Sequence, residues 1–300
     1  MGVKDLVRTS DIRQPTVLGW AWASLVANIG IILTGGLVRL TGSGLGCPTW
    51  PRCTEESFVP HSSLGWHGAI EFGNRLLTYV LIAIAIGTFF AVWRWAGATS
   101  TMKQLTVLIG IGIPFQGVIG GITVLTQLNP WVVALHLLLS MGLVVAATVL
   151  LVLVRGEDGS RVDDLTRRLV LFAYGLLLIA IYLGTIVTGS GPHAGDADAP
   201  RNGLDPLFWT RVHAMSVWAL VAVTLVVVWR LRGHRVQRAA WIVLAAELLQ
   251  GAIGYVQHFT GLPIGLVAVH LVGAAILLAA TTHLVLQVAP LRRDREPVDA

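Results

Sequence analysis

Stretches of 20 or more mostly apolar residues recur along the whole chain, and they constrain its fold more than any other feature. Each stretch is long enough to cross the hydrocarbon core of a bilayer, about 30 Å thick, as an α-helix. We therefore expect eight membrane-spanning helices. Their ranges are 17–37, 67–93, 104–126, 130–154, 168–189, 208–230, 238–257 and 263–289.

The overall composition agrees with a chain whose solvent is lipid. Of its 300 residues 55% are hydrophobic and only 12% are charged, a balance that does not suit a water-facing surface. The expected fold class is therefore an all-α integral membrane protein. Because the first span lacks a small-residue cleavage pattern, we interpret it as an uncleaved helix rather than a signal peptide.

Lysine and arginine are unevenly divided between the two sides of this predicted membrane protein. One set of segments contains 16 of the 21 basic residues. Positively charged short loops stay in the cytoplasm, so we expect a multi-pass protein of the cell membrane with both termini cytoplasmic. The net charge of +5 then reflects topology and not nucleic-acid binding. The 16 residues are Lys4, Arg8, Arg13, Arg94, Lys103, Arg155, Arg161, Arg167, Arg168, Arg230, Arg232, Arg235, Arg238, Arg292, Arg293 and Arg295, and the other five are Arg39, Arg52, Arg75, Arg201 and Arg211.

An internal repeat divides the chain into two halves. Residues 116–148 align without a gap on residues 250–282, and the match includes polar and small residues, which chance apolar similarity would not align. The aligned pairs include Gln116 with Gln250, Gly117 with Gly251, Ile119 with Ile253, Gly120 with Gly254 and His136 with His270. More weakly, Thr34-Gly35 at the end of the first span resembles Thr188-Gly189 at the end of the fifth.

The repeat predicts two four-helix bundles, one within residues 1–155 and one within residues 156–300. An even number of spans in each half gives both halves the same orientation, so a pseudo-twofold axis along the membrane normal should relate them. The halves differ most in their first outer loop, which is about 15 residues longer in the N-terminal half and contains both cysteines. This divergence indicates that the two bundles divide their work.

Three histidines, His136, His213 and His270, fall within apolar spans at similar depths near the outer side. An ionisable ring is costly there and needs a partner, and imidazole is a common axial ligand of haem iron. We expect His213 and His270 to form a bis-histidine site for a low-spin haem b in the C-terminal bundle. For any one of the three, a hydrogen-bonded packing role is the alternative.

Glu247 and five of the other histidines are interpreted as lying outside the site. Glu247 should pack or form a hydrogen bond, and His283 lies too far toward the cytoplasmic side to meet the other histidines. The histidines expected to be solvated are His61, His193, His234 and His258.

The N-terminal half lacks one ligand of the matching pair, because Asn74 aligns with His213. On the same span, His67 and Glu71 are spaced so that they share a helical face with Asn74. The carboxylate of Glu71 would then face the same cavity as His136. Two roles stay open for this carboxylate. It forms an ion pair with Arg75, four residues on, or it acts as a catalytic or proton-relaying group.

The two cysteines, Cys47 and Cys53, lie in the long outer loop, which faces a compartment where disulfides persist. Either they form a disulfide that staples the loop, or they are a redox-active thiol pair near the cofactor.

Together these motifs resemble those of the haem A synthase family. The resemblance rests on the run from Thr34 to Gly46, the Cys-Pro-x-Trp-Pro-x-Cys loop, the Glu-Phe-x-x-Arg run from Glu71, the Gln-Gly motif before His136 and the second-half histidines. It covers nearly the whole chain. It implies an oxidoreductase acting on a CH or CH2 group, which converts the ring methyl of haem O to the formyl group of haem A and so serves cytochrome oxidase assembly.

The resemblance also implies roles for single residues. Haem b binds to residues that match His213 and His270, the substrate haem O binds where His136 matches one ligand, and the essential glutamate of the family matches Glu71. In this sequence Asn74 departs from the family, because many members have a second histidine there in a Glu-x-x-His-Arg pattern.

The departure leaves two possibilities for the substrate iron. Either His136 alone holds it, or His67 replaces the missing ligand. His67 lies two turns from Asn74, roughly 10 Å by helical rise, which favours His136 alone.

The implied mechanism places Glu71 beside the methyl group, where it stabilises developing positive charge and positions a water. Two hydroxylations give a geminal diol that loses water, and electrons leave through the haem iron and haem b. Expected partners are haem O synthase as the donor of haem O, membrane lipid and an external electron acceptor. The alternatives are a two-haem b-type electron-transfer cytochrome, against which the asymmetry at Asn74 argues, and a transporter, for which helices broken at the midplane would be expected.

Overall fold

The structure is a computed structural model that describes residues 12–157 and 159–289. Within them it contains eight long α-helices, one 3-10 turn and no strand, which confirms the all-α class. Each of the eight expected spans coincides with one helix. In order they are α2 (Gln14–Leu40), η1 (Ser62–Leu64), α3 (Gly65–Trp93), α4 (Ser100–Leu125), α5 (Pro130–Arg155), α6 (Asp164–Ser190), α7 (Pro206–Arg230), α8 (Gln237–Phe259) and α9 (Ile264–Val288).

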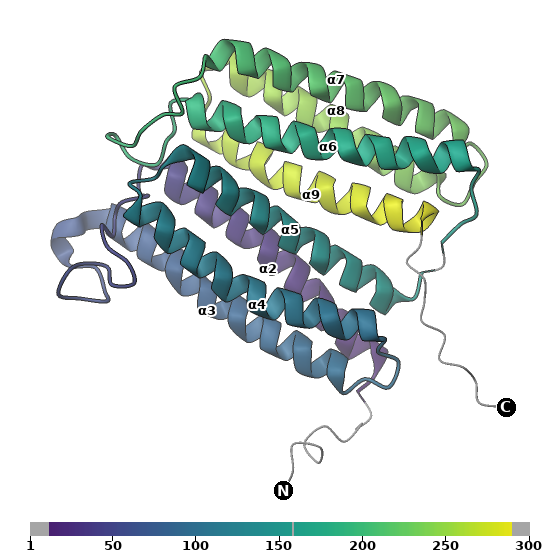
Figure 1. Cartoon of the computed structure of the whole chain (residues 1–300), viewed down its shortest axis with the longest axis horizontal. Coiled ribbons are helices and arrows are strands. Elements are labelled where there is room, and N and C mark those ends of the chain that lie inside the picture. Colours follow the sequence, from purple (N-terminus) through teal and green to yellow (C-terminus); the bar gives the residue numbers. More distant parts are fainter. Residues whose placement is uncertain (1–11, 158, 290–300) are drawn as a thin grey trace, which may run out of the picture.

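All eight of these described helices are long and apolar enough to cross a membrane. The chain is therefore a multi-pass membrane protein. The basic residues expected before α2 and after α9, namely Lys4, Arg8, Arg292, Arg293 and Arg295, lie outside the described residues. The start of α2 and the end of α9 lie at the same end of the molecule, as an even number of spans requires (Figure 1).

The two halves form two sets of four helices that lie side by side (Figure 1). Helices α2 to α5 pack on one another in sequence, and α6 to α9 repeat the same pattern. Between the sets α5 packs on α9, while α5 also contacts α6 and α9 contacts α2. This exchange of equivalent contacts is the pattern that a pseudo-twofold relationship produces.

Helix α5 lies at the centre of the molecule. Half of its most apolar window is buried, at 50%, whereas the other seven helices bury between 22% and 33% and expose the rest to the surroundings. One close approach between the halves depends on a glycine. A Cβ atom at Gly36 of α2 would overlap the end of the Leu271 side chain of α9, so the glycine allows the leucine to pack closely at this crossing.

Local sequence fixes where the helices with candidate ligands begin. Asn129 caps α5 by accepting a hydrogen bond from the Trp131 N–H at 3.0 Å, and Asp205 caps α7 through the Phe208 N–H at 2.8 Å. A proline occupies the first turn of both helices, where no backbone N–H is needed. Helix starts at these two points determine the depth of the histidines that follow.

The linker between the halves is fastened to the end of α9. Glu157 accepts a hydrogen bond from His283 at 2.6 Å and pairs with Arg155 at 3.0 Å. Partial burial raises the pKa of Glu157, but the hydrogen bond and charge of His283, helped by Arg155 and Gln287, bring it below its ordinary value. His283 thus has a structural partner far from the other histidines, as expected.

Candidate functional site

The three histidines of the spans lie at one level near the outer end of the bundles. His136 is in α5, His213 in α7 and His270 in α9, and each follows the first residue of its helix by six or seven positions. At 1.5 Å per residue this is roughly 10 Å into each helix. The equal depth predicted from the sequence is therefore confirmed.

Each histidine ring packs against a glycine of the preceding helix. A Cβ atom placed on that glycine would stand 3.5 Å from the Cε1 atom of the ring in all three cases. A small residue at this position leaves room for the ring between the two helices, and the repeat has preserved this arrangement. The pairs are Gly120 with His136, Gly184 with His213 and Gly254 with His270.

In the C-terminal bundle the rings of His213 and His270 are close enough to interact electrostatically. Nδ1 of His213 lies 3.0 Å from the backbone oxygen of Ala180, whereas Nδ1 of His270 is buried without a hydrogen-bond partner among the described residues. A histidine that binds a metal commonly donates its other ring N–H to a carbonyl, which fixes the tautomer and aims the free nitrogen at the metal. This pair has the features of a bis-histidine haem site.

The donor set fits haem better than a bare metal ion. Within residues 12–157 and 159–289 no group of three or more His, Cys, Asp or Glu side chains is placed to hold an ion. A structural zinc site would need four protein ligands, whereas haem brings its own four nitrogens and needs only one or two axial ligands. Paired and single imidazoles between apolar helices therefore suit haem.

The N-terminal bundle presents one histidine instead of two. Nδ1 of His136, like Nδ1 of its repeat partner His270, is buried and has no hydrogen-bond partner in the part of the chain that the structure describes, an uncommon state for a buried nitrogen. Gln116, from the repeated Gln-Gly motif, holds α5 at this point by donating to the His136 carbonyl at 3.2 Å and to Ser140 Oγ at 3.1 Å.

Asn74 and His67 of α3 point to other partners. Asn74 Oδ1 accepts a hydrogen bond from Thr34 Oγ1 at 2.8 Å, which ties α3 to α2. Nδ1 of His67 lies 3.0 Å from Ser43 Oγ, and its ring packs on Trp66. Since His67 is held by the outer loop, the structure favours His136 alone as the histidine of this bundle.

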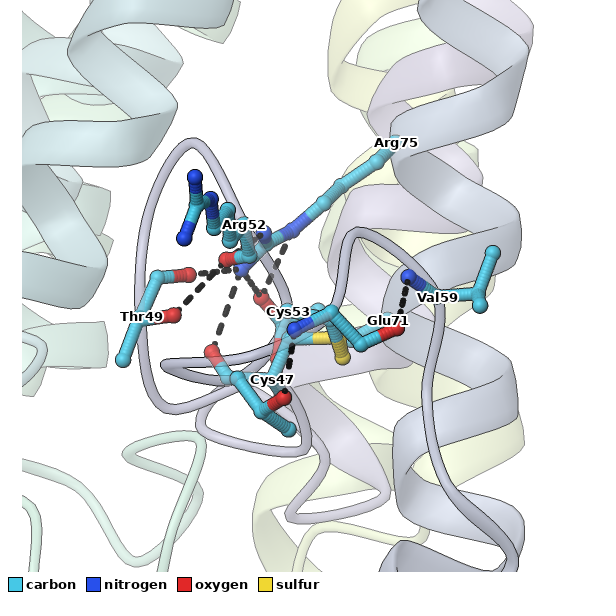
Figure 2. Close-up of a disulfide and its surroundings, with 9 residues drawn as sticks. Cys47, Thr49, Arg52, Cys53, Val59, Glu71 and Arg75 are labelled. Carbon is cyan, nitrogen blue, oxygen red and sulfur yellow. Dashed lines mark hydrogen bonds and ion pairs between the residues drawn. A yellow bond between two sulfur atoms is a disulfide. The ribbon is translucent and has the colours of Figure 1, made fainter.

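Glu71 is buried, with 5% of its surface exposed, and both carboxylate oxygens are bonded. Oε2 accepts the Cys47 backbone N–H at 2.5 Å, and Oε1 accepts from Arg75 at 2.5 and 3.1 Å (Figure 2). The ion pair with Arg75, one of the two roles left open by the sequence, is therefore present.

Arg75 reaches from α3 into the outer loop and binds its backbone (Figure 2). Its guanidinium donates to the carbonyls of Cys47 at 3.1 Å, Thr49 at 3.0 Å and Arg52 at 3.2 Å. Within this loop Cys47 and Cys53 form a disulfide, so the staple is confirmed.

The same loop covers the outer end of α4. The indole of Trp50 packs directly on Gly121, the neighbour of the glycine that faces His136. The loop that binds the Glu71–Arg75 pair therefore also reaches α4 at the residue next to Gly120, the glycine that faces His136.

Comparison with known proteins agrees with this arrangement. A sequence profile for a family described as cytochrome oxidase assembly protein matches residues 19–202, which is more than half of the chain. The chain belongs to this family. The resemblance to haem A synthases drawn from the motifs is thereby confirmed.

Relatives of this cytochrome oxidase assembly family member cover nearly its full length. Proteins named heme A synthase are 24% identical in Bacillus mycoides (strain KBAB4), over 88% of this chain and 92% of the relative, and 24% identical in Geobacillus kaustophilus (strain HTA426), over 96% and 95%. A heme A synthase of Rhodopseudomonas palustris (strain TIE-1) is 26% identical over 86% and 85%.

One interpretation of the sequence of this family member was wrong. His193 is not a solvated surface group, because it is half-buried and its Nε2 lies 3.0 Å from the Leu262 carbonyl, which joins the loop after α6 to the turn between α8 and α9. His61, His234 and His258 are exposed as expected. Glu247 is a hydrogen-bonding residue, as predicted, and accepts from Thr224 at 2.8 Å.

Sequence reasoning missed the groups that position the ligands. Gly184, the Ala180 carbonyl and the loop residue Trp50 were not predicted as parts of the site. The repeated pairs Gly120 with Gly254 and His136 with His270 contained a signal for the glycine contacts, because equal spacing between a glycine and a histidine in both halves indicates a shared packing relationship.

Proposed function

We propose that this protein is a haem A synthase, an oxidoreductase that oxidises the ring methyl of haem O to a formyl group and so provides haem A for terminal oxidases. The proposal is supported by relatives of that name, which match 85% or more of both chains in the three cases given above. It is also supported by the local chemistry, because half-buried imidazoles between apolar helices suit haem.

The observation that carries the proposal is the difference between two otherwise equivalent bundles. The C-terminal bundle has a histidine at both ligand positions, whereas the N-terminal bundle has His136 at one and Asn74 at the other. A carrier with two equivalent haems would keep both pairs. The difference is explained if the two bundles have different functions, with a resident haem b on His213 and His270 and substrate haem O on His136.

Each group then has a defined task. His213 and His270 hold haem b, which when bound supplies one-electron transfer. His136 holds and orients the substrate haem O. Each hydroxylation of the methyl by water would release two electrons and two protons, and the geminal diol formed by the second would lose water to leave the aldehyde. The electrons pass to an external acceptor.

We assign Glu71 an electrostatic role in this reaction. A carboxylate that accepts hydrogen bonds from Cys47 and Arg75 is held in a fixed position, which suits electrostatic stabilisation better than repeated proton transfer. The disulfide loop above it would exclude bulk water from the reacting methyl.

The proposed setting is the cell membrane, with both termini in the cytoplasm. The lysine and arginine distribution supports this orientation, because basic loops stay on the cytoplasmic side. Haem O is a lipophilic product, and we propose that haem O synthase delivers it through the membrane lipid.

Extraction and chromatography of haems from the purified protein test the proposal. Haem B together with haem O or haem A is expected, and His136→Ala should lose haem O and A while it keeps haem B. Haem B alone, at two per chain, would favour the alternative of a two-haem b-type electron-transfer cytochrome. A colourless protein that takes up no haem would overturn both.

A further inference from the structure

A position that holds a ring in the C-terminal half is open in the N-terminal half. The Thr-Gly pairs at residues 34 and 188 align the ends of α2 and α6, and the same offset aligns Gly30 with Gly184. Gly184 faces the ring of His213 at 3.5 Å, whereas no atom lies within 4 Å of the place where a Cβ of Gly30 would stand. The N-terminal bundle therefore keeps the glycine but not the ring.

Asn74, which aligns with His213, does not fill this position. Its Oδ1 is tied to Thr34 Oγ1 at 2.8 Å, and its Nδ2 would be 4.0 Å from a Cβ on Gly35. Thr34 lies four residues after Gly30, one helical turn closer to the outer end. By contrast, the ring of His213 points at Gly184 and bonds to the carbonyl of Ala180.

The hydrogen bond from Thr34 also orients the amide. Because Oδ1 accepts from the hydroxyl, Nδ2 is the remaining donor of the Asn74 side chain. An amide donor held at Thr34, one helical turn from the open position at Gly30 and on the side of the bundle that lacks a histidine, is suited to bind a small molecule.

We propose that Gly30, Thr34 and Asn74 form a site for a small ligand, such as water or a neutral diatomic molecule, next to the haem that His136 would hold, with Asn74 Nδ2 as the hydrogen-bond donor to that ligand. This inference rests on the proposed function. It also explains why the halves differ. Two histidines would leave no place for a further ligand in the C-terminal bundle, which suits electron transfer, whereas the single histidine of the N-terminal bundle would let a reactant bind.

Carbon monoxide and imidazole are the probes, used with the full-length protein in detergent. In the reduced wild type, carbon monoxide should bind one haem per chain, and His136→Ala should abolish this binding. With His213→Ala/His270→Ala the remaining haem should be high-spin when ferric, and added imidazole should convert it to low-spin. Should that double variant fail to fold, the test still rests on two measurements: the number of carbon monoxide molecules bound per wild-type chain, and the loss of this binding in His136→Ala.

Substitutions at the paired positions provide matched controls. Asn74→His should give a low-spin N-terminal haem and weaken carbon monoxide binding by about tenfold or more, because a protein ligand occupies the site most of the time. The reverse change, His213→Asn, should make the C-terminal haem bind carbon monoxide. Asn74→Leu should keep the site open but alter the C–O stretching frequency, because it removes the donor.

Two results separate the failure of this inference from that of the proposed function. A His136-dependent haem that is low-spin in the wild type and binds no carbon monoxide would overturn the inference and leave the enzyme proposal standing. Absence of any haem that depends on His136 would overturn the proposed function itself.

Discussion

The ring of His270 lies against Gly254 as the ring of His136 lies against Gly120, with 3.5 Å between Cε1 and the position of a Cβ in both pairs. The duplicated chain has thus kept a contact between two helices, and not only a residue type. The contact explains why these buried rings have a fixed direction, since a ring confined by the neighbouring helix has few alternative rotamers.

Enlarging the glycine should displace the ligand. Gly254→Ala should be tolerated, because a Cβ at 3.5 Å makes ordinary contact. Gly254→Leu should push the ring of His270 aside and lower haem B content severalfold, as measured by the pyridine haemochrome assay. Gly251→Leu is the control, since that position is open. Equal haem content in all three variants would contradict the contact's role.

Removing the charge of Glu71 should block the reaction without loss of haem b. Glu71→Gln keeps the shape of the side chain but not its charge, and loss of a single electrostatic contact of this kind costs roughly a hundredfold in rate. Haem O or its alcohol should accumulate in extracts while haem B is unchanged. A normal yield of haem A would exclude the role.

Removing the partner of Glu71 should instead destabilise the fold. Arg75→Met leaves a carboxylate with only 7% side-chain exposure unpaired, and breaking one partner of a buried pair costs roughly 3 to 5 kcal/mol. Thermal unfolding in detergent measures this loss. Adding Glu71→Gln to Arg75→Met should recover part of it, and a double variant no more stable than Arg75→Met alone would show that the charge is not the cause.

Opening the disulfide should loosen the outer loop. Cys47→Ser/Cys53→Ser removes a link between residues six positions apart, worth roughly 2 kcal/mol by loop-closure entropy. We expect trypsin to cleave after the exposed Arg52 faster than in the oxidised wild type. The hydrogen bonds from Arg75 should still retain part of the protection, so adding Arg75→Met should increase cleavage further. Unchanged cleavage would show that the disulfide does not order the loop.

The start of α6 should respond to acid. Hydrogen bonds from the Thr166 side chain and backbone, with a lesser contribution from Arg230, lower the pKa of Asp163 from 3.8 to about 2. Because the folded pKa is lowered, the stabilisation is full above about pH 4 and is lost as the pH falls toward 2. Asp163→Asn keeps a capping side chain but does not titrate. The difference in melting temperature between wild type and this variant should therefore shrink over that range, and a constant difference would refute the assignment.

Some properties of the site could be predicted because they follow directly from the order of residues in the sequence. Hydropathy summed over about 20 residues determines whether a helix can cross a bilayer, and it located all eight helices to within a few residues at most ends. The gap-free repeat fixed the equivalence of His136 and His270. Spacing along one helix likewise brought Glu71 and Arg75 together as a possible ion pair, which the structure contains.

Tertiary structure decided which of these groups meet. Helical spacing places His67 on the same face as Glu71, yet the outer loop folds so that His67 forms a hydrogen bond with Ser43. The loop after α6 likewise packs so that the half-buried His193 contacts the carbonyl of Leu262. The sequence by itself determined the spans, their repetition and the residue types at the ligand depth, since none of these depends on which helices pack together. Only the packed helices determined the partners, because contacts between distant residues depend on how each helix is rotated against its neighbours and where each loop closes.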